Sequence, residues 1–140
     1  MVSIISSREM HTCIDRVWFI LADIDKEPYF WPSLNAVTNI SKNGNTVERE
    51  VTIGFRNSKS CQTVMLNPRK SIEVSMISGP ITGVRNILLY TSPMDDNKTR
   101  ISILWDVDLS KVPVSNRTTT IKNIKKETVE ALNRISQLVE

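Results

Sequence analysis

The pattern of apolar and polar positions changes near the end of this chain, from a period typical of strands to a period typical of a helix. Between residues 117 and 139 the apolar face recurs every three or four positions, at Ile121, Ile124, Thr128, Leu132, Ile135 and Leu138. Charged residues occupy the opposite face, at Lys122, Lys125, Lys126, Glu130 and Arg134. The spacing predicts an amphipathic helix about 34 Å long, whose apolar face has to cover a sheet.

Six stretches in the middle of the chain are predicted to be strands. They cover residues 35–41, 46–55, 60–66, 71–77, 83–91 and 100–109, and residues 2–6 show the same alternation at the start. Turn-forming residues separate them at 43–45, 56–58, 67–69, 78–80 and 95–97. Short connections of this kind join neighbouring strands as hairpins, so the sheet is expected to be antiparallel.

The region between the first two strands is predicted to be helical. Apolar residues have helical spacing from 11 to 22, with Thr12 as the expected N-cap, and residues 28–32 form a short second helix or turn. The predicted fold class is α+β, with one strand, two helices, six strands and a long helix in that order. Twist curls such a sheet into a half-pipe. The long helix should close its open side and leave a cavity, which is the helix-grip architecture.

Two strands show which side chains should face the interior. In the strand at 100–109 the odd positions are apolar, whereas Asp106 and Asp108 fall on the outer face. In the strand at 46–55 the alternation directs Val47, Val51 and Ile53 inward, and it directs Arg49 inward with them. Arg49 is therefore the clearest charged residue that the pattern predicts inside the protein.

Arg49 has two interpretations. A guanidinium in the interior needs a partner, because an unpaired buried charge is costly. In the first interpretation, Arg49 has a structural role: it forms an internal ion pair, or its side chain extends so that the charge reaches the sheet edge. In the second, it anchors a ligand by binding a carboxylate, phosphate or carbonyl group. Arg85 is a second candidate, but its strand is apolar on both faces, so alternation leaves its direction undecided.

The same strand bears on the oligomeric state. If Val84, Leu88 and Tyr90 face the cavity, then Ile87 and Leu89 face outward, and an exposed apolar strip indicates a dimer surface. The alternative is that a neighbouring element covers these two residues. The chain is therefore expected to be a monomer or a homodimer.

The predicted cavity lining is mostly apolar, which is the usual composition of a small-molecule site. Periodicity assigns to it Trp18, Val51, Phe55, Met76, Leu88, Trp105, Ile124, Thr128 and Leu132. Phe30 and Trp31 are expected at one lip of the mouth, or else in a purely structural role. Arg49 and Tyr90 are the candidate polar ligand-binding groups. Met76 suits an irregular apolar ligand and an ordinary core equally well.

Composition narrows the class of protein. The 140 residues are 40% hydrophobic and 24% charged, which is typical of one globular domain covering residues 1–140. No apolar run approaches the roughly 20 residues that cross a bilayer, and the start lacks the pattern of a signal peptide. A cytoplasmic location without an integral membrane segment is expected, and a transient contact with a membrane is left open.

Residues that carry chemistry are sparse. Cys13 and Cys61 are expected to be free thiols, and His11, the sole histidine, is expected in a surface or capping role. A metal site lacks ligands, no cofactor is predicted and no catalytic residue is assigned. The formal charge of +3 is too small and too evenly spread to predict nucleic-acid binding.

Two local motifs stand out beside this pattern. The first is Val-Trp-Phe-Ile-Leu-Ala-Asp-Ile-Asp at 17–25, followed by Tyr-Phe-Trp-Pro-Ser-Leu at 29–34, and the second is Ser-Gly-Pro-Ile at 78–81. With the element order, they resemble the START-like (SRPBCC) superfamily, nearest to its polyketide cyclase/dehydrase and coenzyme-Q-binding branches. The resemblance spans nearly all of the chain. The sequence departs from the usual pattern at Pro28, which comes early, and at Ile81, which replaces an aromatic residue.

Three functions are consistent with these observations. The first is a non-enzymatic binding or transport protein for a small hydrophobic ligand, and the resemblance implies a lipid, isoprenoid, quinone or polyketide-like molecule. The second is a cyclase/dehydrase-type enzyme, with Arg49 stabilising an enolate and Tyr90 as the best available acid or base. The third is an interaction module with a filled cavity. Several inward polar groups would favour the enzyme, one the carrier and none the module.

Overall fold

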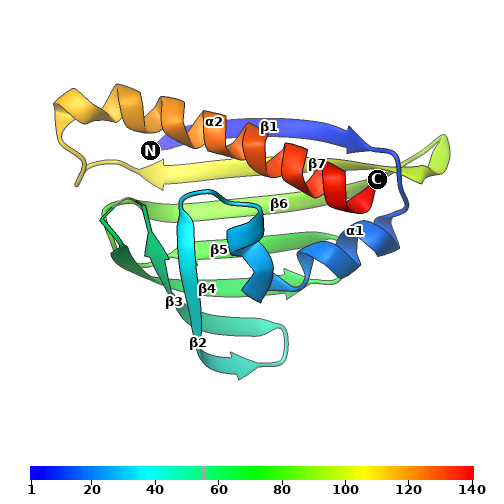
Figure 1. Ribbon diagram of the computed structural model, residues 1–140, viewed down its shortest axis with the longest axis horizontal. Coiled ribbons are helices and arrows are strands. Elements are labelled where there is room, and N and C mark those ends of the chain that lie inside the picture. Colours follow the sequence, from blue (N-terminus) through cyan, green and yellow to red (C-terminus); the bar gives the residue numbers. More distant parts are fainter. Residues whose placement is uncertain (55) are drawn as a thin grey trace.

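The computed structural model describes residues 1–54 and 56–140 of the chain (Figure 1). Its elements, in order, are β1 (Val2–Met10), α1 (Ile14–Leu21), the short 3-10 helix η1 (Ile24–Tyr29), β2 (Leu34–Asn43), β3 (Thr46–Ile53), β4 (Ser58–Asn67), β5 (Ser71–Met76), β6 (Thr82–Ser92), β7 (Asp95–Asp108) and α2 (Val114–Val139). The α+β class and the element order predicted from the pattern are confirmed.

The strands form one antiparallel sheet in the order β1-β7-β6-β5-β4-β3-β2. Strands that follow one another in sequence are neighbours from β2 to β7, and β1 pairs with β7 to complete the sheet. Figure 1 shows α2 crossing one face of this curved sheet, with η1 and α1 beside it. This is the predicted helix-grip architecture, in which the helix lies across the concave face of the sheet.

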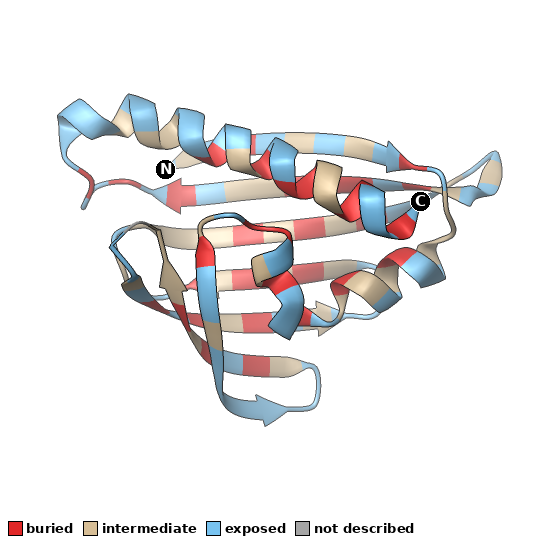
Figure 2. Ribbon diagram, viewed as in Figure 1, coloured by how far each residue is buried: buried red, intermediate tan, exposed pale blue. Residues whose placement is uncertain are grey.

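The core lies between that face and the part of α2 from Ile124 to Val139. All the buried residues of α2 belong to this part (Figure 2). On β7, Ile101, Ile103 and Val107 are fully buried, whereas Asp106 and Asp108 are exposed, as the alternation predicts. Before Ile124, α2 contributes no buried residue, although Ile121 packs against the core.

The dimer interpretation placed Leu88 and Tyr90 inside, but the structure buries the alternate residues of β6. Arg85, Ile87 and Leu89 are buried, Leu88 is half-buried, and Tyr90 is 51% exposed on the outer face. Alternation could not decide between the two faces, because both carry apolar residues. The core covers Ile87 and Leu89, so these residues form no exposed strip, and the prediction of a dimer loses the observation on which it depended.

Several element ends differ from prediction. The predicted turn at 95–97 belongs to β7, because β6 and β7 continue as a long hairpin that closes at the Ser92–Asp95 pair. The helix α2 begins at Val114, three residues before the apolar period starts, because its first turn is exposed and carries no apolar signal. Neither Thr12 nor Asp23 makes a side-chain cap; Cys13 and Asp23 occupy the N-cap positions without such a bond.

Candidate functional site

A cavity of about 260 Å³ lies between the concave face and the middle of α2. Its wall includes the apolar side chains of Trp31, Leu34, Ile53, Met76, Pro80, Ile81, Trp105 and Ile124. Its polar lining consists of Ser33, Ser60, Gln62, Arg85, Thr120, Asn123 and Glu127. Strands β2 to β7 and α2 all contribute, so the site depends on the complete half-pipe and on no single motif.

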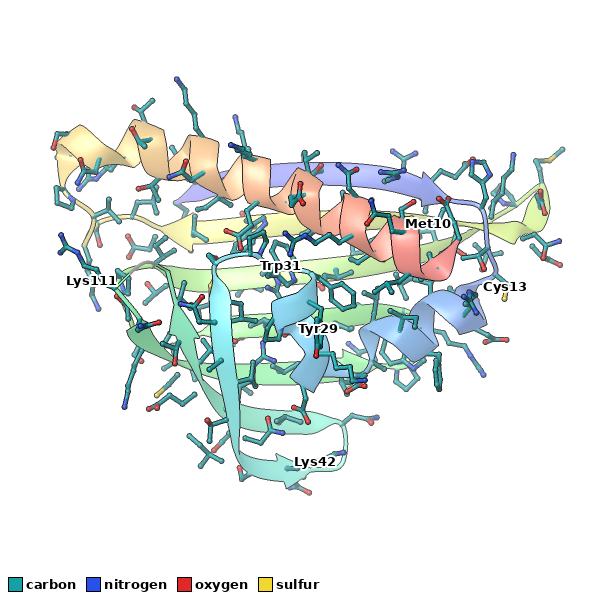
Figure 3. All side chains as sticks on the ribbon, in the orientation of Figure 1. Met10, Cys13, Tyr29, Trp31, Lys42 and Lys111 are labelled. Atoms are coloured by element: carbon teal, nitrogen blue, oxygen red, sulfur yellow. The ribbon has the colours of Figure 1, made fainter. Side chains whose placement is uncertain are left out.

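Two tryptophans form an aromatic corner of this cavity. Trp31 follows η1, and Trp105 lies on the inward face of β7; their rings meet edge to face, with centroids 5.6 Å apart and an interplanar angle of 84°. Figure 3 labels Trp31, which lies between η1 and the sheet. The indole Nε1 of Trp105 donates a hydrogen bond of 3.0 Å to Thr128 Oγ1 on α2. The corner is thus fixed from the sheet, from η1 and from the helix.

Arg85 carries a positive charge to the cavity wall. Its guanidinium carbon lies 4.3 Å from the centre of the Trp31 ring and 5.7 Å from the centre of the Trp105 ring. Its Nη2 donates a hydrogen bond of 2.5 Å to Glu27 Oε2. Its Nε is buried and has no hydrogen-bond partner among the described residues. A donor left in this state costs free energy until an acceptor reaches it.

Arg49 lies deeper and is fully engaged. Its Nη2 donates to Glu27 Oε1 at 2.5 Å and to Gln62 Oε1 at 2.8 Å, while its Nε donates to the same Gln62 oxygen at 3.0 Å. Of the two interpretations of Arg49, the structure supports the internal ion pair. Gln62 lines the cavity, whereas Arg49 is not part of its lining.

Glu27 holds the two arginines together from η1. Burial raises the pKa of Glu27, but the charges of Arg85 and Arg49 and their hydrogen bonds more than offset this, and the pKa lies below its usual value. Burial likewise lowers the pKa of Arg85, against the attraction of Glu27. The cluster contains two guanidinium groups and one carboxylate, so one positive charge is left over beside the cavity.

Glu127 lies at the mouth of the cavity. Its Oε1 accepts hydrogen bonds from the backbone N–H of Ser33 at 3.0 Å and from Ser33 Oγ at 2.6 Å. The same two residues also line an outer groove formed with Pro32, Asn35, Gly54 and Lys126. This contact therefore ties the middle of α2 to the segment between η1 and β2, where the cavity meets the surface.

Of the residues predicted to line the cavity, some do so, some lie in the surrounding core and some lie on the outer face of the sheet. Trp31, Met76, Trp105 and Ile124 line the cavity. Thr128, Val51 and Leu132 are buried around it, and Trp18 packs against the core. Leu88 and Tyr90 lie on the outer face of β6.

Phe30 is buried, and it lines a separate surface hollow together with Phe19, Tyr29 and Leu138. Phe30 and Trp31 therefore do not form one lip of the cavity mouth. Phe55 lies outside the described residues.

Sequence reasoning missed Glu27, Gln62 and Glu127. Glu27 lies in a segment rich in charged residues, and such a segment is expected to be exposed. No neighbouring residue indicates that two arginines from distant strands surround it. Gln62 gave no clear signal either, because Ser60, Gln62 and Val64 face inward but both faces of this strand mix apolar and polar residues. Glu127 lies three residues after Ile124 and four before Ala131, so its spacing places it beside the apolar face of the helix, and the Ser33 contact holds it at the cavity mouth.

Residues 1–54 and 56–140 contain neither a metal-ligand cluster nor a membrane-spanning helix. No group of three or more His, Cys, Asp or Glu side chains in this part of the chain could hold a metal ion. None of its helices is both long enough and apolar enough to span a membrane. Cys13 and Cys61 are free thiols.

Comparison with solved structures identifies the architecture. The Zhui aromatase/cyclase of a Streptomyces species superposes with a TM-score of 0.83 at 13% identity, over 97% of this chain and 92% of that one. A protein of Thermus thermophilus gives 0.81 at 11% identity, over 99% and 97% of the two chains. A START superfamily protein of Mycobacterium smegmatis gives 0.70 at 15% identity, over 98% and 96%.

Sequence comparison gives no comparable match. No protein-family profile matches this chain, and neither does any curated protein. At identities of 11–15% the structural likeness establishes the fold alone. The predicted resemblance is confirmed at that level: the chain has the START-like helix-grip fold, with aromatase/cyclases among its structural relatives.

Proposed function

We propose that this protein binds a small, predominantly apolar ligand in the cavity between the sheet and α2, with an acceptor group of the ligand bound to Arg85. The observation that carries the proposal is the position of Arg85, a residue of the cavity wall that belongs to a cluster of two guanidinium groups and one carboxylate. A carbonyl, carboxylate or phenolate oxygen complements the positive charge that this cluster leaves over.

The size of the cavity restricts the ligand. An engineered cavity of about 150 Å³ holds benzene, so a cavity of about 260 Å³ suits one or two rings with short substituents. A polyketide-like or quinone head group fits this volume better than a long isoprenoid or acyl chain. Apolar burial at about 25 cal/mol per Å² supplies the affinity, and Arg85 supplies the orientation.

Several polar residues line the cavity, and by number alone they meet the criterion that favours an enzyme, but their state favours binding over catalysis. Ser60 Oγ donates to the carbonyl of Ser78, Thr120 Oγ1 donates to the carbonyl of Asn116, and Gln62 Oε1 accepts from Arg49. Most polar groups of the wall are thus held by the protein itself. Tyr90, the expected acid or base of a cyclase-type enzyme, lies on the outer face of β6 and gives that alternative no support.

The first test is native mass spectrometry of the protein purified from its own cells, followed by extraction and identification of any retained small molecule. A retained ring compound with an oxygen acceptor supports the proposal. A bare protein that also fails to bind a panel of apolar dyes would overturn it and favour the interaction module.

Variants locate the binding on the cavity. Ile124→Phe adds bulk to the cavity wall without touching the Glu27 ion pairs, so it should lower dye or ligand affinity about ten-fold. The matched control is Val129→Phe, which adds the same ring on the exposed side of the same helix. Equal effects of the two substitutions would place the ligand elsewhere.

A further inference from the structure

We infer that Glu127 is a second ligand anchor, so that the ligand carries a hydrogen-bond donor at the cavity mouth as well as an acceptor at Arg85. The inference rests on the proposed function, because it concerns the same cavity, and it assigns to that cavity a narrower class of ligand. The class is a compact ring compound with an oxygen acceptor at one end and a hydroxyl or amino group at the other.

The first support is the fixed position of the Glu127 carboxylate. Its Oε1 accepts two hydrogen bonds from Ser33, one from the backbone and one from the side chain, at 3.0 and 2.6 Å. A carboxylate held by two donors on a neighbouring segment is pre-organised, so a ligand that binds it loses little additional side-chain entropy.

The second support is the other oxygen of the same group. Glu127 Oε2 makes no hydrogen bond to any residue that the structure describes, and Glu127 is part of the cavity wall. An ionised carboxylate oxygen is an acceptor only. It therefore selects a donor on the ligand and disfavours an acceptor at the same place.

The third support is the separation of charge across the cavity. Arg85 comes from β6 and belongs to a cluster with one excess positive charge, whereas Glu127 comes from α2 and carries a negative charge at the mouth. A ligand with an acceptor at the inner end and a donor at the outer end matches both charges. A ligand with acceptors at both ends satisfies Arg85 and is repelled by Glu127.

Three naphthoic acids test this selection. Each has the carboxylate for Arg85, and the far ring carries an amino group, a hydrogen atom or a methoxy group. The amino group donates a hydrogen bond, whereas the methoxy group can only accept one. Isothermal titration calorimetry should show the amino compound binding about ten-fold more tightly than the methoxy compound, as expected for a hydrogen bond to a charged group.

Glu127→Gln then identifies the residue responsible. The glutamine retains one oxygen for Ser33 and replaces the other oxygen by a donor, so the preference for the amino compound should disappear or reverse. Glu130→Gln is the control, because it makes the same substitution on the same helix outside the cavity lining, so the preference should persist. Thermal unfolding of both variants verifies that they are folded.

The outcomes separate the two proposals. Equal affinity for the amino and methoxy compounds, or a preference that survives Glu127→Gln, would overturn the role of Glu127 and leave the cavity as a binding site. Failure of all three acids to bind would count against the proposed function itself, and the anchor would fail with it.

Discussion

The guanidinium of Arg85 lies 4.3 Å from the centre of the Trp31 ring, so a buried cation is held against an aromatic face at the edge of the cavity. The same group is paired with Glu27, and Glu27 is paired with Arg49. The stacking and the ion pair hold Arg85 in place before any ligand arrives. This arrangement leads to predictions about stability, about pH and about packing.

Replacing the central carboxylate should destabilise the protein strongly. Glu27→Gln leaves two buried guanidinium groups without a counter-charge, and the loss of one member of a buried ion pair costs about 3–5 kcal/mol. Urea unfolding followed by tryptophan fluorescence measures the loss. The control is Glu130→Gln, whose exposed pair with Arg134 should contribute less than about 0.5 kcal/mol. Similar losses in the two variants would contradict the buried cluster.

The stability of the protein should fall in acid partly through Glu27. Because the pKa of Glu27 is lower in the folded protein than its usual value of 4.5, the ionised form favours folding. This contribution is complete above pH 4.5 and is lost as the pH falls through the folded-state pKa.

The lowered pKa values of Asp108 and Glu140 act in the same direction as that of Glu27. The difference in pH dependence between the native protein and Glu27→Gln therefore isolates the Glu27 contribution. Unfolding free energies measured at a series of pH values should converge for the two proteins as the pH falls below 4.5. A constant difference across that range would contradict the lowered pKa.

The close approach of β6 and β7 at Gly83 should tolerate no side chain. Gly83 has φ of +133°, and an alanine Cβ there would lie 2.1 Å from the carbonyl oxygen of Asp106 and 2.8 Å from Cα of Val107. Backbone strain and the clash together should cost Gly83→Ala about 3 kcal/mol in chemical denaturation.

Gly44→Ala separates the two causes. Gly44 also has positive φ, but a Cβ there meets nothing within 4 Å, so its cost should be about 1 kcal/mol. An equal cost at the two positions would mean that the strands move apart without resistance at Gly83.

The hydrogen bond between Trp105 and Thr128 should couple the sheet to α2. Thr128→Val keeps the shape of the side chain but removes the acceptor of the indole N–H, at a cost of about 1–3 kcal/mol. In a Trp105→Phe background the same substitution should cost about 1 kcal/mol less, which a double-mutant cycle measures. An interaction energy near zero would mean that water replaces Thr128.

The sequence determined the fold and the direction of most strands. The alternation on β7 and the period of α2 depend on neighbouring residues only, so the inward positions of Ile101, Ile103 and Ile135 could be predicted from the pattern. The same alternation placed Arg49 inside. It could not orient β6, because a strand with apolar residues on both faces carries no alternating signal, and Leu88 and Tyr90 were assigned to the wrong face.

The tertiary structure alone decided the chemistry of the site. Glu27 from η1, Arg49 from β3 and Arg85 from β6 meet only when the sheet curls and η1 closes against it, and each of them separately is an ordinary charged residue. Glu127 likewise gains its position from Ser33, which lies 94 residues away in the chain. Local periodicity encodes which way a residue faces; the partners of a buried charge are set by contacts between distant segments, and these exist only in the folded chain.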